Sequence, residues 1–175
     1  MTLFLLILYS NIFLILVPRH QERGKEVGEI LDKQEVNFVF RNQIGDNIAP
    51  MEFGNLDCLL VNTTGELKYF YEKATLVFVG KSLTARGGQS PVEPAALAKP
   101  IIFGPHMGNF EEITAKFLSN EAAIQVADEF ELEEAFELLI KDQSKRNALG
   151  KAAQKVVREN EGAIEQTISM ILAAI

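Results

Sequence analysis

Short apolar runs alternate along this chain with segments that have the spacing of amphipathic helices. Several of the runs are apolar throughout, which is typical of strands covered on both faces. Repeated strand–helix units predict an α/β fold with a doubly wound, mostly parallel sheet, whose ligand site lies outside the carboxyl ends of the strands. The predicted strands are 12–17, 36–41, 58–61, 75–80, 101–103 and 123–126.

The segments between these runs carry helix signals. Thr63 is a candidate N-cap, and Glu66 three residues later would complete a capping box. Residues 42–57, rich in Asn, Gly and Asp, predict a long loop. The chain has no internal repeat or low-complexity linker, so we expect one domain over residues 1–175. The predicted helices are 21–34, 63–73, 91–98, 109–119, 129–141 and 143–175, the last of which can break near residues 161–162.

The charge and the cysteine content exclude two classes of function. The formal net charge is −7, with acidic residues spread through the predicted helices, so the chain lacks the basic surface that binds DNA or RNA. Cys58 is the single cysteine, which excludes an internal disulfide and a cysteine-rich metal site. Because it stands in an apolar run, we expect a packed core thiol in a reducing compartment.

Residues 1–17 are almost wholly apolar and admit two interpretations. A membrane-spanning helix needs about 20 apolar residues, whereas this run is shorter and is interrupted at Tyr9, Ser10 and Asn11. The favoured interpretation is a helix up to Tyr9, a turn, and a buried strand from Ile12. The alternative is contact of this end with a membrane.

Clusters of polar residues and glycines follow the predicted strands. Because the carboxyl ends of parallel strands lie at one edge of a sheet, we expect these clusters to meet there. Glycines and backbone amides beside helix starts suit a phosphate, and carboxylates suit the hydroxyls of a sugar. The clusters are Pro18 to His20, Thr63 to Glu66, Lys81 and Ser82, Gly87 to Glu93, and Pro105 to Asn109.

Arg19 and two carboxylates have both a ligand-binding and a structural interpretation. Arg19 can hold a phosphate through two hydrogen bonds, or it can pair on the surface with Glu22 or Glu26. Glu93 and Glu66 can accept hydrogen bonds from ribose hydroxyls. Equally, Glu93 stabilises its own helix by charge, and the capping box explains Glu66 without a ligand.

The remaining candidates are less specific. His20 and His106 are the only histidines, and their surroundings make a poor zinc site. For both, a hydrogen bond to a carbonyl or a phosphate is favoured over general-base catalysis. Lys81 can neutralise a leaving phosphate or can be solvated. The pair Gly87 and Gly88 alone is weak evidence for a phosphate loop.

Together these strings resemble one family, the 3-deoxy-D-manno-octulosonic acid (Kdo) transferases of lipopolysaccharide synthesis. The matching pieces follow the family's order and spacing across nearly the whole chain after residue 12, which makes the match highly specific. They are LVPRHQER at 16–23, TTGEL at 63–67, FVGKSL at 78–83, GGQSPVEPAAL at 87–97 and FGPHMGNF at 103–110.

The resemblance implies the carboxyl-terminal, donor-binding half of a two-domain GT-B glycosyltransferase with a Rossmann-like fold. Its donor would be CMP-Kdo and its acceptor a lipid A precursor, with inverting transfer of the sugar and departure of CMP. It implies no obligatory metal and no redox cofactor. The intact enzyme would act at the cytoplasmic face of the bacterial inner membrane, and this chain would be cytoplasmic or peripherally membrane-associated. The catalytic base would lie in an amino-terminal half that this sequence does not contain, so we expect the chain alone to be inactive.

Carried over position by position, the resemblance implies contacts to the CMP moiety, with Arg19 stabilising the charge on the leaving phosphate. The implied contacts are Pro18, Arg19, Thr64, Gly65, Glu66, Ser90, Pro91, Val92 and Glu93. Secondary candidates are His20, Lys81, Ser82, Gly87, Gly88, His106 and Asn109.

Three positions depart from the family's pattern: Lys81 replaces a glycine, Asn62 an aspartate and Ser90 an asparagine. They keep two alternatives open. One is a non-catalytic remnant or interaction module with the same fold, and the other is a GT-B enzyme for another nucleotide sugar. The apolar spacing in residues 143–175, together with residues 1–9, further predicts self-association through exposed helices.

Overall fold

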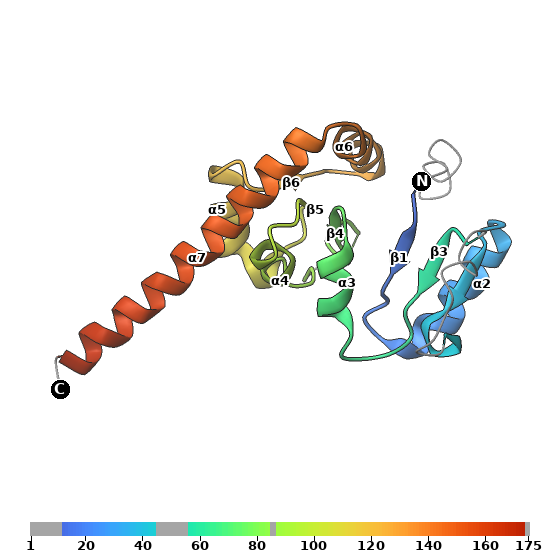
Figure 1. The fold of residues 1–175 in the computed structure, drawn as a ribbon, viewed down its shortest axis with the longest axis horizontal. Helices are drawn as coiled ribbons and strands as arrows, with labels where there is room; N and C mark the ends of the chain where they lie inside the picture. Colours follow the sequence, from blue (N-terminus) through green and yellow to red (C-terminus); the bar gives the residue numbers. More distant parts are fainter. Residues whose placement is uncertain (1–11, 45–55, 85–86, 174–175) are drawn as a thin grey trace. The chain divides into compact units, whose positions relative to one another are not determined.

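The computed structural model describes residues 12–44, 56–84 and 87–173 (Figure 1). The chain divides into two compact units, one that ends at Phe70 and one that begins at Tyr71. They are referred to as unit 1 and unit 2, and each is described by itself. The boundary between them falls within helix α3 (Leu67–Lys73). The expected single donor-binding domain over the whole chain stays a prediction.

Unit 1 contains a three-stranded parallel sheet. Its strands are β1 (Leu14–Leu16), β2 (Phe38–Phe40) and β3 (Cys58–Leu60), in the order β1-β3-β2. The last residues of β1 and β2 are both in register with Leu60, so the three strands end at one edge of the sheet. The polar segments that follow the strands therefore start from the same edge.

Helix α2 (Gly24–Lys33) covers one face of this sheet. Its Leu31 packs in a cluster of buried residues with Cys58 and Leu60 of β3. Gly28 allows a close approach, because a Cβ atom there would lie 3.0 Å from Cζ of Phe40. The amphipathic helix predicted after the first strand is thus confirmed, with its first turn in 3-10 geometry at Gln21–Arg23.

The Cys58 thiol is completely buried in this cluster, as predicted. Burial, and to a lesser degree the charge of Asp57, raises the pKa of Cys58 from 9.0 to about 12. We therefore expect no reaction with an aromatic disulfide reagent at pH 8 until urea unfolds unit 1, as absorbance will show. Since the unfolded chain releases this proton at lower pH than the folded chain, the free energy of unfolding should fall as pH rises from 9 to 12.

Unit 2 contains a second three-stranded parallel sheet, in the order β4-β5-β6. Its strands are β4 (Val77–Val79), β5 (Ile101–Phe103) and β6 (Ile124–Gln125). Its helices are α4 (Val92–Ala96), α5 (Glu111–Ser119), α6 (Glu129–Lys141) and α7 (Gln143–Ala173), with a 3-10 turn at Gly108–Phe110.

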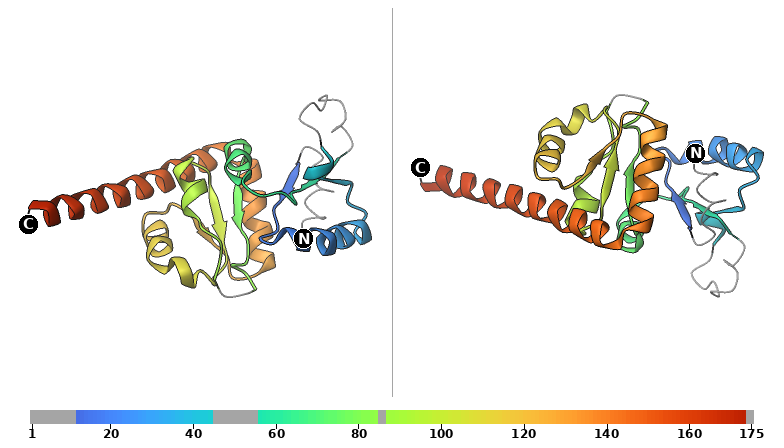
Figure 2. Two further views of the ribbon diagram at one scale, coloured as in Figure 1. Left: turned by 90° about the horizontal axis from the view of Figure 1, so that it is seen from below. Right: turned by 90° about the horizontal axis from the view of Figure 1, so that it is seen from above.

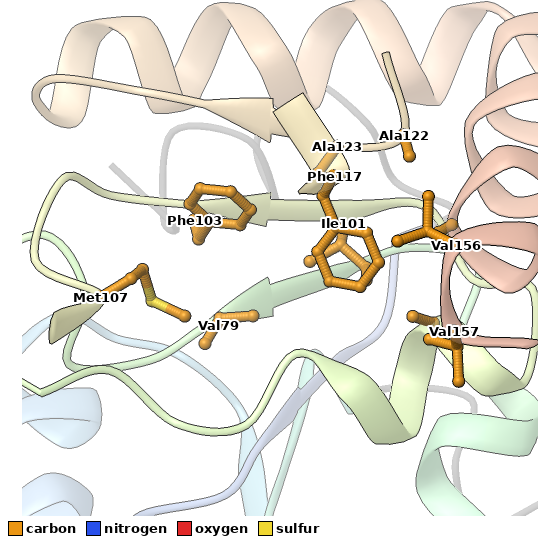
Figure 3. Packing of buried hydrophobic residues seen from close by; sticks show 11 residues of the cluster. Val79, Ile101, Phe103, Met107, Phe117, Ala122, Ala123, Val156 and Val157 are labelled. Atoms are coloured by element: carbon orange, nitrogen blue, oxygen red, sulfur yellow. The ribbon is translucent and has the colours of Figure 1, made fainter. Parts of the chain in front are cut away.

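Both faces of this second sheet are covered. Ile101 and Phe103 of β5 belong to a cluster that includes Phe117 of α5 and Val156 of α7 (Figure 3). Ile102, between them, belongs to another cluster formed largely by α6. All three β5 residues are completely buried. A strand that is apolar at every position and buried on both faces is the arrangement expected for a doubly wound parallel sheet.

Helix α7 continues past the core of unit 2. Among the residues whose burial is described, Val157 is the last residue of α7 in the buried cluster, and the helix continues without interruption to Ala173. In both views of Figure 2 its end extends well beyond the strands. The predicted break near residues 161–162 is wrong, because a glycine costs a helix only about 1 kcal/mol relative to alanine and no proline follows Gly162. Among the described residues, no helix combines the length and the hydropathy that a bilayer crossing requires.

The observed elements agree with the predicted ones in type and order. Helix α6 and strand β5 span the predicted residues, whereas the other strands are shorter than the apolar runs that predicted them. Arg41–Gln43 form a 3-10 turn where a strand end and a loop are predicted. The predicted helix up to Tyr9 and most of the predicted loop 42–57 lie outside the described residues.

Candidate functional site

In unit 1, polar residues follow all three strands at the shared carboxyl edge. Pro18, Arg19 and His20 come after β1, Arg41 comes after β2, and residues 62–66 come after β3. The backbone N–H of Asn42 donates to Oδ1 of Asn62 at 3.1 Å, which ties the second of these segments to the third. The predicted clusters after β1 and β3 thus start from one edge of this sheet, and the meeting of all the predicted clusters at a single edge stays a prediction.

The Glu66 carboxylate is held by two side chains. Arg41 donates from Nε at 3.1 Å and from Nη2 at 2.8 Å to Oε1 of Glu66, and the Thr63 hydroxyl donates to Oε2. The hydrogen bond from Thr63, and after it the bonds and charge of Arg41, hold the pKa of Glu66 below its ordinary value. Glu66 is therefore ionised at neutral pH and can only accept hydrogen bonds.

The predicted capping box is wrong. Helix α3 begins at Leu67, so Thr63 stands too far ahead of it to be its N-cap. The Glu66 side chain binds the Thr63 hydroxyl and the Arg41 guanidinium because a charge-assisted bond is stronger than a bond to a backbone amide. Sequence reasoning missed Arg41, which it counts as the end of a strand. Its position directly after β2, at the ligand-binding edge, is the signal that could have found it.

The other predicted residues of unit 1 lie on the surface. Arg19, His20, Thr64 and Gly65 are exposed, and Pro18 is half-buried. Gly65 has a φ of +83°, a left-handed conformation that favours glycine. It lies in the turn that leads from β3 to Glu66.

One of the two surface partners considered for Arg19, Glu26, is bonded to another arginine. Glu26 accepts hydrogen bonds from Arg23, from Nε at 3.1 Å and from Nη2 at 3.2 Å. Both side chains of this pair are more than half exposed, so the pair contributes little to stability. Glu26 therefore forms its ion pair with Arg23 and not with Arg19.

In unit 2, the segments after β4 and β5 are joined by a network of hydrogen bonds. The buried Ser82 hydroxyl donates to the Val79 carbonyl at 2.6 Å and accepts from the Gly104 amide at 2.7 Å. The His106 amide donates to the Ser82 carbonyl at 2.8 Å, and the Gly88 amide to the His106 carbonyl at 2.9 Å. The two predicted ligand loops thus lie side by side, with Ser82 as their internal support.

The structure explains why glycine occupies both Gly87 and Gly88 in the loop after β4 without a ligand. Gly87 has a φ of +82°, and a Cβ atom there would lie 2.9 Å from Nδ2 of Asn109. A Cβ atom at Gly88 would collide with the sulfur of Met107. Because the Gly88 amide already bonds the His106 carbonyl, a phosphate at this loop would be held by other groups. The His106 and Asn109 side chains are exposed.

Residues 90–93 lead into α4. The Val92 amide donates to the Ser90 hydroxyl at 3.3 Å, and Pro91 is the N-cap residue rather than the first helical residue. Helix α4 has five residues, so its few aligned peptides offer a weaker dipole than the predicted eight-residue helix. Glu93 is exposed. Burial, and after it the charge of Glu93, raises the pKa of Tyr71 to about 12, which places the phenol near that carboxylate.

Lys81 occupies a backbone conformation that favours glycine. Its φ is +64°, and its side chain is exposed. We expect Lys81→Gly to stabilise unit 2 by about 0.5 to 1 kcal/mol, because glycine adopts this conformation without the Cβ penalty. Urea unfolding followed by circular dichroism will measure it. In the matched control Lys155→Gly, within helix α7, stability should instead fall by about 1 kcal/mol.

Within 12–44, 56–84 and 87–173, no three His, Cys, Asp or Glu side chains are grouped so that they could hold a metal ion. His20 lies in unit 1 and His106 in unit 2. Their predicted role in hydrogen bonding to a ligand stays a prediction.

Comparison with known proteins identifies the family. Residues 55–156 match the family described as "Glycosyl transferases group 1". The chain belongs to this glycosyltransferase family. The match covers the third strand of unit 1 and the β4, β5 and α4 region of unit 2. It therefore includes the predicted ligand loops of both units, except the loop after β1.

The resemblance to Kdo transferases is confirmed by curated relatives. The chain is 36% identical over 168 residues to the 3-deoxy-D-manno-octulosonic acid transferase of Haemophilus influenzae, covering 95% of the chain and 38% of the relative. It is 29% identical over 159 residues to that of Bordetella pertussis, covering 90% and 36%. The chain thus spans about two fifths of the length of these curated relatives.

A solved structure supports the same assignment. The chain matches the crystal structure of the C-terminal CMP-Kdo binding domain of WaaA from Acinetobacter baumannii with a TM-score of 0.79 and 28% identity. The alignment covers 87% of this chain and 77% of that one. The Rossmann-like fold predicted for the carboxyl-terminal domain of a GT-B glycosyltransferase is confirmed by this match and by the parallel strands with helices on both faces.

Proposed function

We propose that this chain is the donor-binding part of a Kdo transferase and that it binds the CMP moiety of CMP-Kdo. The observation that carries the proposal is the similarity to a solved CMP-Kdo binding domain over 87% of the chain. The polar carboxyl edges of the two sheets support it, because ligands of open parallel α/β sheets bind outside the carboxyl ends of the strands.

The exposed charges at these edges match the chemistry of a cytidine monophosphate ester. The exposed guanidinium of Arg19 suits the phosphate and would stabilise the charge that grows on it as CMP leaves. The exposed carboxylate of Glu93 suits the ribose hydroxyls. As further contacts to the nucleotide we propose Pro18, Thr64 and Gly65 of unit 1 and Ser90, Pro91 and Val92 of unit 2.

For the complete enzyme we propose inverting transfer of Kdo to a lipid A precursor at the cytoplasmic face of the bacterial inner membrane. The curated relatives are more than twice as long as this chain. We assign the catalytic base and the acceptor surface to the part of the enzyme that corresponds to the rest of their length. The residues of this chain would then bind and orient the donor and stabilise the leaving phosphate.

We also propose that the chain self-associates through α7. The carboxyl-terminal end of α7 extends beyond the strands of unit 2 (Figure 2), and its sequence repeats apolar residues at Ile164, Ile168 and Ile171, the spacing of one helix face. Light scattering without detergent should give a mass above the 19.5 kDa of one chain. A monomer over the whole accessible concentration range would contradict this proposal.

Calorimetric titration with CMP, UMP and GMP tests the donor-binding proposal. We expect saturable binding of CMP that is at least about tenfold tighter than binding of UMP or GMP. Arg19→Gln and Glu93→Gln should each weaken the binding of CMP by about tenfold, as expected for the loss of a charge-assisted hydrogen bond. Arg158→Gln, at an exposed position of α7, removes the same unit of charge as Arg19→Gln and should leave the affinity unchanged.

Two results of the titration would redirect the assignment. Tighter binding of UMP or GMP than of CMP would favour a GT-B enzyme for another nucleotide sugar. No saturable binding of any nucleotide at about millimolar concentration would favour the non-catalytic remnant and contradict donor binding by this chain.

A further inference from the structure

The Glu66 carboxylate has three of its acceptor positions filled from within unit 1. Oε1 accepts from two nitrogens of Arg41, at 3.1 and 2.8 Å, and Oε2 accepts from the Thr63 hydroxyl. A carboxylate offers about four acceptor positions. Among the residues that the structure describes, none occupies the remaining position, on Oε2, which can accept from a ligand, and the direction of the carboxylate is fixed by its other bonds.

Arg41 is itself fixed. Its Nη1 donates to the Ile44 carbonyl at 2.9 Å, and the amide of the next residue, Asn42, donates to Asn62 at 3.1 Å. The turn after β2 is therefore bound to the segment after β3 at two points. The side chains of Arg41 and Glu66 are 24% and 28% exposed, so the ion pair lies at the surface of the carboxyl edge, partly shielded from solvent.

We propose that Arg41 is a positioning residue of the nucleotide site, which orients Glu66 so that Oε2 accepts a hydrogen bond from a hydroxyl or amino group of the nucleotide. This inference rests on the proposed function. Arg41 acts through Glu66, because the nitrogens that could reach the carboxylate are already bonded to it and Nη1 is bonded to Ile44. An acceptor fixed before binding loses less conformational entropy when the ligand arrives.

A set of variants separates this role from a purely structural one. CMP affinity is measured by calorimetry for the unchanged chain, for Glu66→Gln, Arg41→Met and Arg41→Lys, and for the double variant of Arg41→Met with Glu66→Gln. Lys155→Met is the control: Lys155 is 76% exposed on α7, and its loss removes one positive charge as Arg41→Met does. Circular dichroism confirms that each variant is folded at the temperature of the titration.

The expected losses are not additive. Glu66→Gln and Arg41→Met should each weaken the binding of CMP by about tenfold. The double variant should bind CMP no more weakly than either single variant. Arg41→Lys should recover part of the affinity, because an ammonium keeps the charge but lacks the fork that binds Oε1 twice. Lys155→Met should bind as the unchanged chain does. The carboxyl carbon resonance of Glu66 should titrate at higher pH in Arg41→Met than in the unchanged chain.

Each outcome decides a separate point. If the unchanged chain binds CMP and Arg41→Met binds equally well, the role of Arg41 is overturned while the proposed function stands. Losses that add in the double variant would also overturn it, since Arg41 would then act on the ligand independently of Glu66. If Arg41→Met does not fold, Arg41→Lys is the deciding variant. A CMP affinity of Arg41→Lys equal to that of the unchanged chain would overturn the proposal. Failure of the unchanged chain to bind CMP would overturn the proposed function, and this inference with it.

Discussion

Alanine in place of Gly104 is expected to destabilise unit 2 by about 3 kcal/mol. Gly104 directly follows β5 and is buried. A Cβ atom there would collide with the Ser82 carbonyl oxygen and would lie 2.6 Å from Cα of Leu83. These neighbours are backbone atoms, so no change of rotamer can relieve the collision. The substitution would also disturb the 2.7 Å bond from the Gly104 amide to the Ser82 hydroxyl, which joins the two loops.

Urea unfolding of the full chain, followed by circular dichroism, measures this effect. Gly108→Ala is the matched control, because it lies in the same loop region and the nearest atom to its Cβ position is a flexible carboxylate oxygen of Glu111 at 3.8 Å. We expect the control to change stability by less than about 0.5 kcal/mol. A Gly104→Ala variant as stable as the control would contradict the described contact between the loops.

Gly150→Ala is expected to destabilise unit 2 by about 2 kcal/mol or more. Helix propensity alone predicts the opposite sign, a gain of about 1 kcal/mol for alanine within a helix. The steric contact outweighs the helix propensity, because a Cβ atom at Gly150 would collide with the carbonyl oxygen of Ala98 and would lie 2.8 Å from its carbonyl carbon. Ala98 has a φ of +54° at the end of α4, and α7 crosses it at Gly150.

The same unfolding experiment tests this second prediction, with Asn147→Ala as control. Asn147 is exposed on α7, so alanine there should be neutral or slightly stabilising. If Gly150→Ala is as stable as that control, then α7 does not pack on the end of α4 as described. Gln154 offers an independent check, since its Nε2 donates to the Ala96 carbonyl at 2.8 Å across the same contact.

The sequence is sufficient for elements whose signals are local. Strand β5 is a wholly buried apolar run between Pro100 and Gly104, and it is observed over its predicted residues. Helix α6 also spans its predicted residues, and its N-cap Asp128 accepts from the amides of Phe130 and Glu131 at 2.9 and 3.0 Å. The break expected in α7 is not observed, because one glycine is too weak a signal to end a long helix.

The site is predictable only in part, because its geometry depends on partners far apart in the chain. The alternation of strands and helices predicts polar residues at a single sheet edge, whereas the structure has two sheets, and the meeting of all the clusters at one edge stays a prediction. The alternation cannot show that Glu66 binds Arg41, which stands 25 residues away, or that Ser82 is buried as a support for Gly104, 22 residues away. Local rules predict a capping box for Glu66. In the structure its carboxylate instead binds the guanidinium of Arg41, which is distant in the sequence.

The central claim is that the polar carboxyl edge of unit 1 binds the CMP moiety. Nuclear magnetic resonance of the isotopically labelled chain during titration with CMP tests it most directly. The account predicts that the amide resonances of Arg19 and Glu66, which follow β1 and β3, shift together with one common dissociation constant. A saturable titration that leaves both resonances in place, or no shifts at all, would contradict it.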